Sequence, residues 1–245
     1  MADPTSSLAP RDARGVTARY AIYYAPEPNH PLTNAAAEWL GRDAFGRVVE
    51  PQARNPSVGD VDRVELTADP RHYGFHATLK APFTLATEKT EQELVKALTD
   101  FAAARTMFVA PLVVADLGPF VALRLASVSP EMDRLHQDCV QYFEVFRAPL
   151  DEADLVRRRR ARLTPLQDER LVAFGYPYIF DDFRFHMTLT GGIPDNALRS
   201  RVIGYLKETF APWEGDHTID RISIFKQEDR KSPFLVLAQA EFSAV

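Results

Sequence analysis

A five-residue pattern, Phe-His-x-Thr-Leu, occurs twice in the sequence, at 75–79 and at 185–189. Side chains alternate between the two faces of a β-strand, so the histidine and threonine of each copy share one face and the apolar residues share the other. The apolar faces can pack against helices, which leaves two polar faces free. If an approximate twofold axis relates the copies, two histidines and two threonines meet in one groove.

Such a groove has the groups that cleavage or hydrolysis of a phosphodiester needs. One imidazole, of His76 or His186, takes the proton of the nucleophile, and the other protonates the leaving oxygen. Histidine suits both tasks because its ordinary pKa of about 6.5 lies near neutral pH. The hydroxyls of Thr78 and Thr188 can hold non-bridging phosphate oxygens. Lys80, expected on the same strand face as His76, can stabilise developing negative charge.

Each motif also has a purely structural interpretation. A single histidine within a strand is usually a hydrogen-bonded core residue. Two copies that share Phe, His, Thr and Leu within repeated surroundings favour a functional site instead. The near symmetry leaves open which histidine is the base and which is the acid.

The elements that follow the two motifs repeat in the same order, a helix and then two strands that flank a turn. Apolar residues at helical spacing predict the helices, and a capping box opens the first of them. We interpret this repeat as an internal duplication, with copy 1 around 72–127 and copy 2 around 180–245. The helix and the two strands are expected at 90–102, 108–117 and 120–125 in the first copy, and at 194–210, 219–227 and 234–242 in the second.

Outside the repeats, the first predicted strand covers 19–24, an aromatic and β-branched run. Residues 46–70 are polar and rich in proline, which predicts a long loop. Residues 1–17 show no periodicity, which predicts a disordered tail ahead of a single domain at 18–245.

Four further residues are candidates for substrate binding. Alternation places Arg124 and Gln227 opposite the apolar side of their strands, so each lies either in the groove or on an exposed strand face. Tyr23 and Tyr73 are also candidates, although tyrosines in such positions more often pack against neighbours than bind ligands.

Two other patterns could be functional but also have a structural explanation. His72 and His76 are four residues apart, as in a helical metal pair, but Gly74 and the alternation after it favour loop and strand, without a metal. The arginines at 157–160 are best explained as a solvated helix face that balances nearby acidic residues, although a phosphate-binding role stays open.

Composition excludes several classes of protein. The 245 residues carry a net charge of −5, and Cys139 is the only cysteine, so an intramolecular disulfide or a thiolate-rich zinc site is excluded. No run of about 18 apolar residues predicts a membrane span, and no signal peptide is recognisable, so we expect a cytoplasmic protein. The sequence also lacks the glycine-rich patterns of dinucleotide-binding folds and P-loops, and the G-x-S-x-G nucleophile elbow.

The twin H-x-T motifs, HATL and HMTL, resemble those of the 2H phosphoesterase superfamily. Within it, the chain from residue 19 onward is similar to a bacterial group of phosphonate-metabolism proteins, over RYAIYYAP, WLGRDAFG, YGFHATLKAPF, FRAPLDEADLVRRR and GYPYIFDDFRFHMTLT. The resemblance implies a bilobal, duplicated α+β fold with two antiparallel sheets and flanking helices around a central groove. It implies metal-free chemistry without a cofactor, and it carries catalytic roles to His76, Thr78, His186 and Thr188.

The sequence therefore predicts a phosphodiesterase that hydrolyses a small or cyclic phosphodiester of a ribose or nucleotide. The stretch between the motifs is longer than in the small RNA-processing members, so an RNA end is the less favoured substrate. The alternative is a non-catalytic module on the same fold that binds a nucleotide or sugar phosphate. The sequence fixes neither the substrate nor the oligomeric state.

Overall fold

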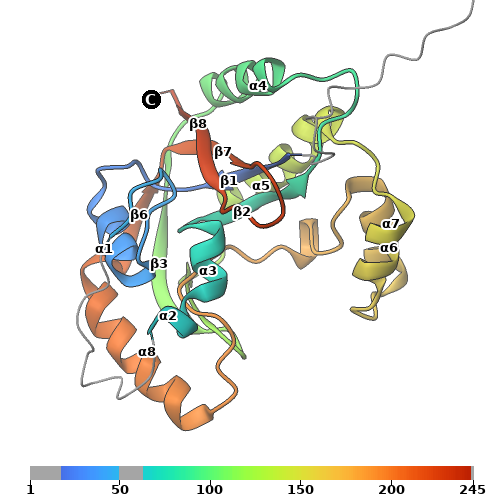
Figure 1. Ribbon diagram of the computed structural model, residues 1–245. Helices are drawn as coiled ribbons and strands as arrows, with labels where there is room; N and C mark the ends of the chain where they lie inside the picture. Colours follow the sequence, from blue (N-terminus) through green and yellow to red (C-terminus); the bar gives the residue numbers. More distant parts are fainter. Residues whose placement is uncertain (1–17, 50–62, 244–245) are drawn as a thin grey trace, which may run out of the picture.

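Eight strands form one antiparallel sheet in the order β6-β3-β4-β5-β2-β1-β7-β8 in the computed structural model, which describes residues 18–49 and 63–243 (Figure 1). The tail predicted at 1–17 lies outside the described residues. The strands are β1 (Arg19–Tyr24), β2 (Ala77–Phe83), β3 (Phe108–Asp116), β4 (Val121–Leu125), β5 (His186–Thr188), β6 (Gly215–Ile219), β7 (Arg221–Gln227) and β8 (Leu235–Glu241).

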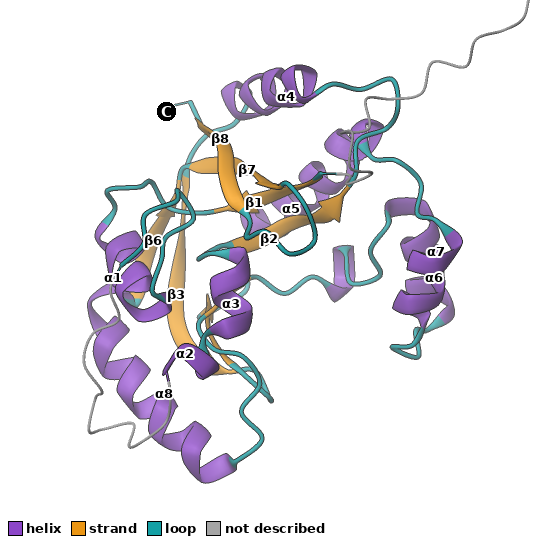
Figure 2. Ribbon diagram, in the orientation of Figure 1, coloured by secondary structure: helices purple, strands orange, loops and turns teal. Residues whose placement is uncertain are grey.

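Some helices lie beside this sheet, and others lie away from the strands (Figure 2). They are α1 (Pro31–Leu40), α2 (Arg63–Leu66), α3 (Ala68–Tyr73), α4 (Glu91–Ala103), α5 (Pro130–Tyr142), α6 (Glu152–Arg159), α7 (Pro165–Phe174) and α8 (Asn196–Phe210), with short 3₁₀ turns at Phe143–Phe146, Phe180–Asp182 and Ala211–Trp213. In the described part of the chain, no helix is long and apolar enough to cross a bilayer. The α+β class is confirmed.

The order of the strands has an approximate twofold symmetry about the middle of the sheet. Strands β2 and β5, which follow or contain the two histidines, pair at Ala77 and Met187, and three further strands continue the sheet on each side. The two sheets expected from the resemblance are thus the two halves of one sheet, joined where the motif strands meet.

The predicted repeat is present in chain order but takes different places in space. Both hairpins form, β3 with β4 and β7 with β8. However, β4 pairs with the motif strand of the other copy, β5, whereas β8 lies at the outer edge. Strand β6, which pairs with β3, was not predicted, because its residues GDHTI combine a glycine with mostly polar side chains.

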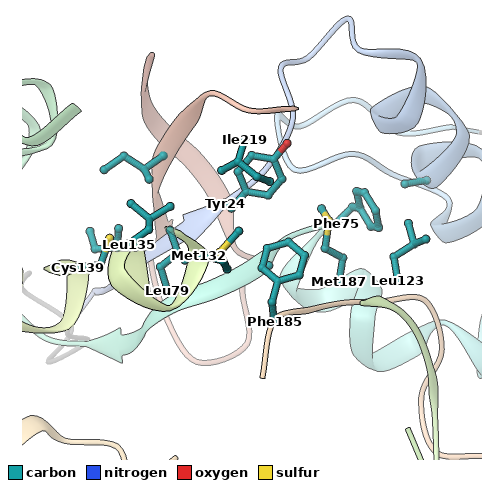
Figure 3. Packing of buried hydrophobic residues seen from close by; sticks show 14 of the residues in the cluster. Tyr24, Phe75, Leu79, Leu123, Met132, Leu135, Cys139, Phe185, Met187 and Ile219 are labelled. Carbon is teal, nitrogen blue, oxygen red and sulfur yellow. The ribbon is translucent and has the colours of Figure 1, made fainter. Parts of the chain in front are cut away.

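The apolar face of the sheet is covered by α4, α5 and α8. The predicted stripe of α4 is buried, and a capping box between Thr90 and Glu93 holds the first turn of that helix. In Figure 3, Leu79 lies near Cys139 and Leu135 of α5, whereas Met187 of the other motif lies beside Phe185 and Phe75. Both motifs therefore direct their apolar residues into the core, as alternation predicts.

The segment before the first motif is helical where a loop was predicted. Within 63–70 the chain forms α2 and the start of α3, and 50–62 lies outside the described residues. The buried guanidinium of Arg42 donates hydrogen bonds to the carbonyls of Arg71, His72 and Phe234. These tertiary bonds join α3 to the start of β8, a contact that local sequence cannot reveal.

Candidate active site

The two motif histidines are held by the same local hydrogen bond. His76 Nδ1 lies 2.9 Å from the carbonyl oxygen of Gly74, and His186 Nδ1 lies 2.7 Å from that of Arg184. A carbonyl only accepts, so each Nδ1 carries a proton and donates it. In the neutral ring the lone pair is then on Nε2, the nitrogen that is free to act on a ligand.

The pairing of β2 with β5 brings the two motifs together. Because antiparallel strands run in opposite directions, the Ala77–Met187 pair sets His76 opposite Thr188 and Thr78 opposite His186. All four side chains line one groove of about 610 Å³. The predicted convergence of two histidines and two threonines is therefore present in the geometry, while their catalytic role stays a prediction.

Aromatic rings surround His76. The ring of Tyr23 stacks on it with centroids 3.9 Å apart, and Phe225 and Tyr73 lie at 5.8 and 6.0 Å. Burial lowers the pKa of His76 to about 4, with His186 and Arg42 adding repulsion against the bond to Gly74. His76 is therefore neutral at pH 7. Its Nε2 lies 3.3 Å from the hydroxyl of Thr78.

Gly74 fixes the orientation of His76. It ends α3 with φ of 77°, in the region that favours glycine. A Cβ there would lie 3.0 Å from the Cβ of Ala44 and 3.1 Å from its Cα. The residue thus combines a left-handed backbone with close packing, and its carbonyl accepts the His76 proton.

Lys80 does not line the groove, and its predicted position was wrong. The register of β1 against β2 passes from Tyr23–Thr78 to Ile22–Lys80, so β2 carries one extra residue at this point. Such a bulge reverses the alternation beyond it. The Lys80 ammonium is buried against α5, where it donates to Val140 O at 3.0 Å and pairs with Glu144 at 2.7 Å.

The remaining predicted residues divide between wall and support. Tyr23 and Tyr73 line the groove. Arg124 lies opposite His186 on β4, hence on the same face, but its guanidinium donates to Leu125 O and it is not among the groove residues. Gln227 is fully buried beneath the groove; its side-chain oxygen accepts hydrogen bonds from Arg19, and its amide lies 2.9 Å from His72 Nε2.

Several groove residues were not predicted as ligands. Arg157 and Arg158 of the arginine run line the groove, and Arg157 is also exposed and pairs with Asp154, as the solvated-face interpretation predicts. Arg19 could have been found, because it shares the alternation of Tyr23 on β1. The rest come from distant segments and carry no local signal. The unpredicted lining residues are Arg19, His72, Ala81, Pro82, Tyr176 and Arg230.

Comparison with known proteins places this chain in a family. The family model described as "Protein of unknown function (DUF1045)" matches residues 78–235, which begin at Thr78 within the first motif and include the whole of the second motif. The chain belongs to the DUF1045 family.

Two curated relatives share most of this DUF1045 chain, and both are named "Ribose 1,5-bisphosphate phosphokinase PhnN". The protein from Janthinobacterium sp. (strain Marseille) is 36% identical over 230 residues, which are 92% of the chain and 51% of the relative. The protein from Laribacter hongkongensis (strain HLHK9) is 34% identical over 177 residues, 72% of the chain and 41% of the relative. The DUF1045 chain thus spans about half the length of these relatives, or less.

Solved structures similar to the DUF1045 chain include E. coli LigT complexed with NADP+, with a TM-score of 0.42 and 12% identity over 93% of this chain and 99% of LigT. A conserved protein of unknown function from Agrobacterium tumefaciens str. C58 gives the same TM-score and identity over 95% and 90% of the two chains.

Proposed function

We propose that this DUF1045 protein is a metal-independent phosphodiesterase that hydrolyses a cyclic phosphodiester of a ribose or nucleotide with two histidines. The observation that carries the proposal is the head-to-tail pairing of the two H-x-T motifs. It sets two imidazoles, each with Nδ1 bound to a carbonyl, in the wall of one groove. This is the arrangement that a general base and a general acid need around one phosphorus.

The surroundings of the two rings divide these roles. His76 is neutral at neutral pH because burial lowers its pKa to about 4, so its Nε2 can accept the proton of an attacking water. The water oxygen bonds to phosphorus and one ring P–O bond breaks. His186, protonated on Nε2, gives that proton to the leaving oxygen. The hydroxyls of Thr78 and Thr188 donate to the non-bridging oxygens, where negative charge grows.

The names of the curated relatives point to a substrate class. Opening a cyclic phosphate on a ribose that already carries a phosphate yields a ribose bisphosphate, the compound class in those names. This sequence has no G-x-x-x-x-G-K-[ST] pattern and gives no support for phosphoryl transfer from a nucleotide by this chain. A hydrolase that supplies a ribose bisphosphate is consistent with both observations and with the resemblance to phosphonate-metabolism proteins.

Phosphorus NMR with a panel of cyclic phosphodiesters tests the proposal. The panel contains ribose cyclic phosphates, nucleoside 2′,3′-cyclic phosphates and short 2′–5′ linkages, with EDTA present throughout. We expect ring opening by the wild type and a loss of roughly 10²–10⁴-fold in His76→Ala and in His186→Ala. His30→Asn is the matched control, because it removes an imidazole at the N-cap of α1 and keeps a capping side chain.

Three outcomes contradict the proposal. An unchanged rate in His186→Ala would remove the two-histidine mechanism. Turnover abolished by EDTA would remove its metal independence. Tight binding of one panel member without ring opening at any pH would favour the non-catalytic binding module instead.

A further inference from the structure

The groove of the two histidines continues into a second hollow. This hollow has a volume of about 660 Å³ and is lined by residues of the end of β2, of α6 and of the end of α7. The two spaces share a wall, which we call the arginine wall. It consists of Arg19, Ala81, Pro82, Arg157, Arg158 and Arg230.

The arginine wall gathers four guanidinium groups from three separate parts of the chain. Arg19 begins β1, Arg157 and Arg158 lie on α6, and Arg230 lies in the turn between β7 and β8. None of the six shared residues is acidic. Side chains so far apart in sequence converge only through the fold, which distinguishes the wall from an arginine-rich helix face.

The carboxylates of Asp151, Asp154 and Asp229 line the second hollow, and Asp154 forms ion pairs with the arginine wall. Asp154 pairs with Arg157 at 2.6 Å and with Arg230 at 3.4 Å, so one carboxylate serves two arginines. Arg19 is held by the side-chain oxygen of Gln227, a neutral group. Arg158 lies over the ring of Tyr176, and among the described residues its buried Nε has no hydrogen-bond partner.

The four cations also repel one another. Burial lowers the pKa of Arg158, and the charges of Arg157 and Arg230 lower it further. Burial likewise lowers the pKa of Arg19, with Arg230 and Arg157 contributing. Like charges held together at a partly buried site cost free energy in the unliganded protein, and a bound anion reverses that cost.

We propose that the arginine wall binds a second phosphate of the substrate, a terminal phosphomonoester remote from the phosphodiester that the histidines cleave. A monoester carries nearly two negative charges at pH 7, and arginine forks match its oxygens. The wall adjoins the histidine groove, so a single ligand can span both. This inference rests on the proposed function and narrows its substrate to a phosphorylated cyclic phosphodiester.

A terminal monoester fits the wall better than a length of RNA does. Along a nucleic-acid strand each phosphate carries a single charge, and proteins meet it with cations spread along a track. Here four arginines meet in one wall, and the chain as a whole has a net charge of −5. The cations are concentrated where one dianion would sit.

A pair of substrates that differ only in the remote phosphate tests the inference. Adenosine 2′,3′-cyclic phosphate and its 5′-phosphorylated form, and ribose 1,2-cyclic phosphate and its 5-phosphorylated form, are compared by kcat/KM. We expect a preference for the phosphorylated member of at least roughly tenfold, since a charged hydrogen bond contributes a factor of this order. Arg158→Gln and the exposed Arg157→Gln should each lower that preference toward one. Arg160→Gln is the control, because it removes the same charge from an exposed residue outside the wall. This variant should keep the preference for the phosphorylated substrate.

Binding of ribose 5-phosphate, measured by calorimetry, separates this inference from the proposed function. We expect His76→Ala to bind this probe like the wild type, and Arg158→Gln to bind it at least roughly tenfold more weakly. Equal binding by Arg158→Gln, Arg157→Gln and the wild type would overturn the arginine wall even if cyclic phosphates are hydrolysed. Weakened binding in these variants, with no hydrolysis of any substrate, would uphold the wall and overturn the phosphodiesterase.

Discussion

The two H-x-T motifs are alike in sequence and in their local hydrogen bond, but they differ in what surrounds the imidazole. His76 is stacked on Tyr23, with Phe225 and Tyr73 close by. His186 has Phe120 as an aromatic neighbour, at a centroid distance of 5.8 Å. The first ring is therefore enclosed by a small apolar cluster, whereas the second lies beside the neighbouring strand β4 and its exposed Arg124.

This difference gives the two motifs distinct surroundings, on which the two roles of the proposed mechanism depend. The pairing of β2 with β5 places the two motifs symmetrically, and burial beside Tyr23 lowers the pKa of His76. The asymmetry arises because β1 places Tyr23 under His76, whereas the equivalent position beside β5 is taken by β4, with Ala122 opposite Thr188. In the mechanism we propose, the distinction between base and acid therefore comes from the neighbouring strands rather than from the motif itself.

The largest expected effect comes from changing the leaving group. With a ribose cyclic phosphate, the leaving alkoxide needs a proton, and both His76→Ala and His186→Ala should lose roughly 10²–10⁴-fold. With a p-nitrophenyl phosphodiester, the leaving group departs without a proton, so His186→Ala should regain most of its rate and His76→Ala should not. Initial rates of nitrophenolate release measure this, and rescue of His76→Ala instead would reverse the assignment of roles.

The sequence predicts the motifs, the repeat and most elements, because each depends on local alternation or helical spacing. His76, Thr78, His186 and Thr188 meet as predicted since their register follows from period-2 strands that pair across an axis. The predicted position of Lys80 was wrong because one extra residue in β2 reverses the alternation on which the other predictions depend. No residue type in ATLKAPF marks that extra residue.

The roles of the supporting residues depend on tertiary contacts, which local sequence does not predict. Gln227 has the alternation of a groove residue, but its amide is used to hold Arg19 and His72. Arg158 lines the groove because α6 lies beside it, and the charge run alone does not predict that placement. Local patterns therefore find the two histidines and two threonines of the groove, whereas the residues that surround and support them can be identified only from the fold.

A smaller effect is expected from the glycine that orients His76. In Gly74→Ala, the side chain would approach Ala44 closely at a left-handed backbone position, so the carbonyl that holds His76 Nδ1 must move. We expect kcat to fall roughly 10- to 100-fold, since small displacements of a catalytic group have effects of this order. We also expect a loss of about 1–3 kcal/mol in the free energy of unfolding.

Gly118→Ala is the matched control for this glycine. Gly118 has a φ of 94°, but a Cβ there would meet no atom within 4 Å. It should share the backbone strain and keep the rate. Urea unfolding measures the stability of both variants, and equal kcat in the two would show that Gly74 does not position His76.

The smallest expected effect is a shift in pH dependence, and it tests the comparison of the two rings directly. A base acts only when neutral, and the pKa of His76 is lowered to about 4, so kcat/KM should fall with acid only near pH 4. Tyr23→Leu removes the stacked ring, admits water and weakens the desolvation that lowers this pKa. The acid limb should then move upward by about one to two pH units toward the ordinary value of about 6.5, leaving the rate at pH 8 little changed.

Phe120→Leu, beside His186, is the matched change on the other ring and should leave the acid limb in place. A shift in Phe120→Leu and none in Tyr23→Leu would mean that His186 is the base, because the pH at which the rate falls follows whichever imidazole must lose its proton.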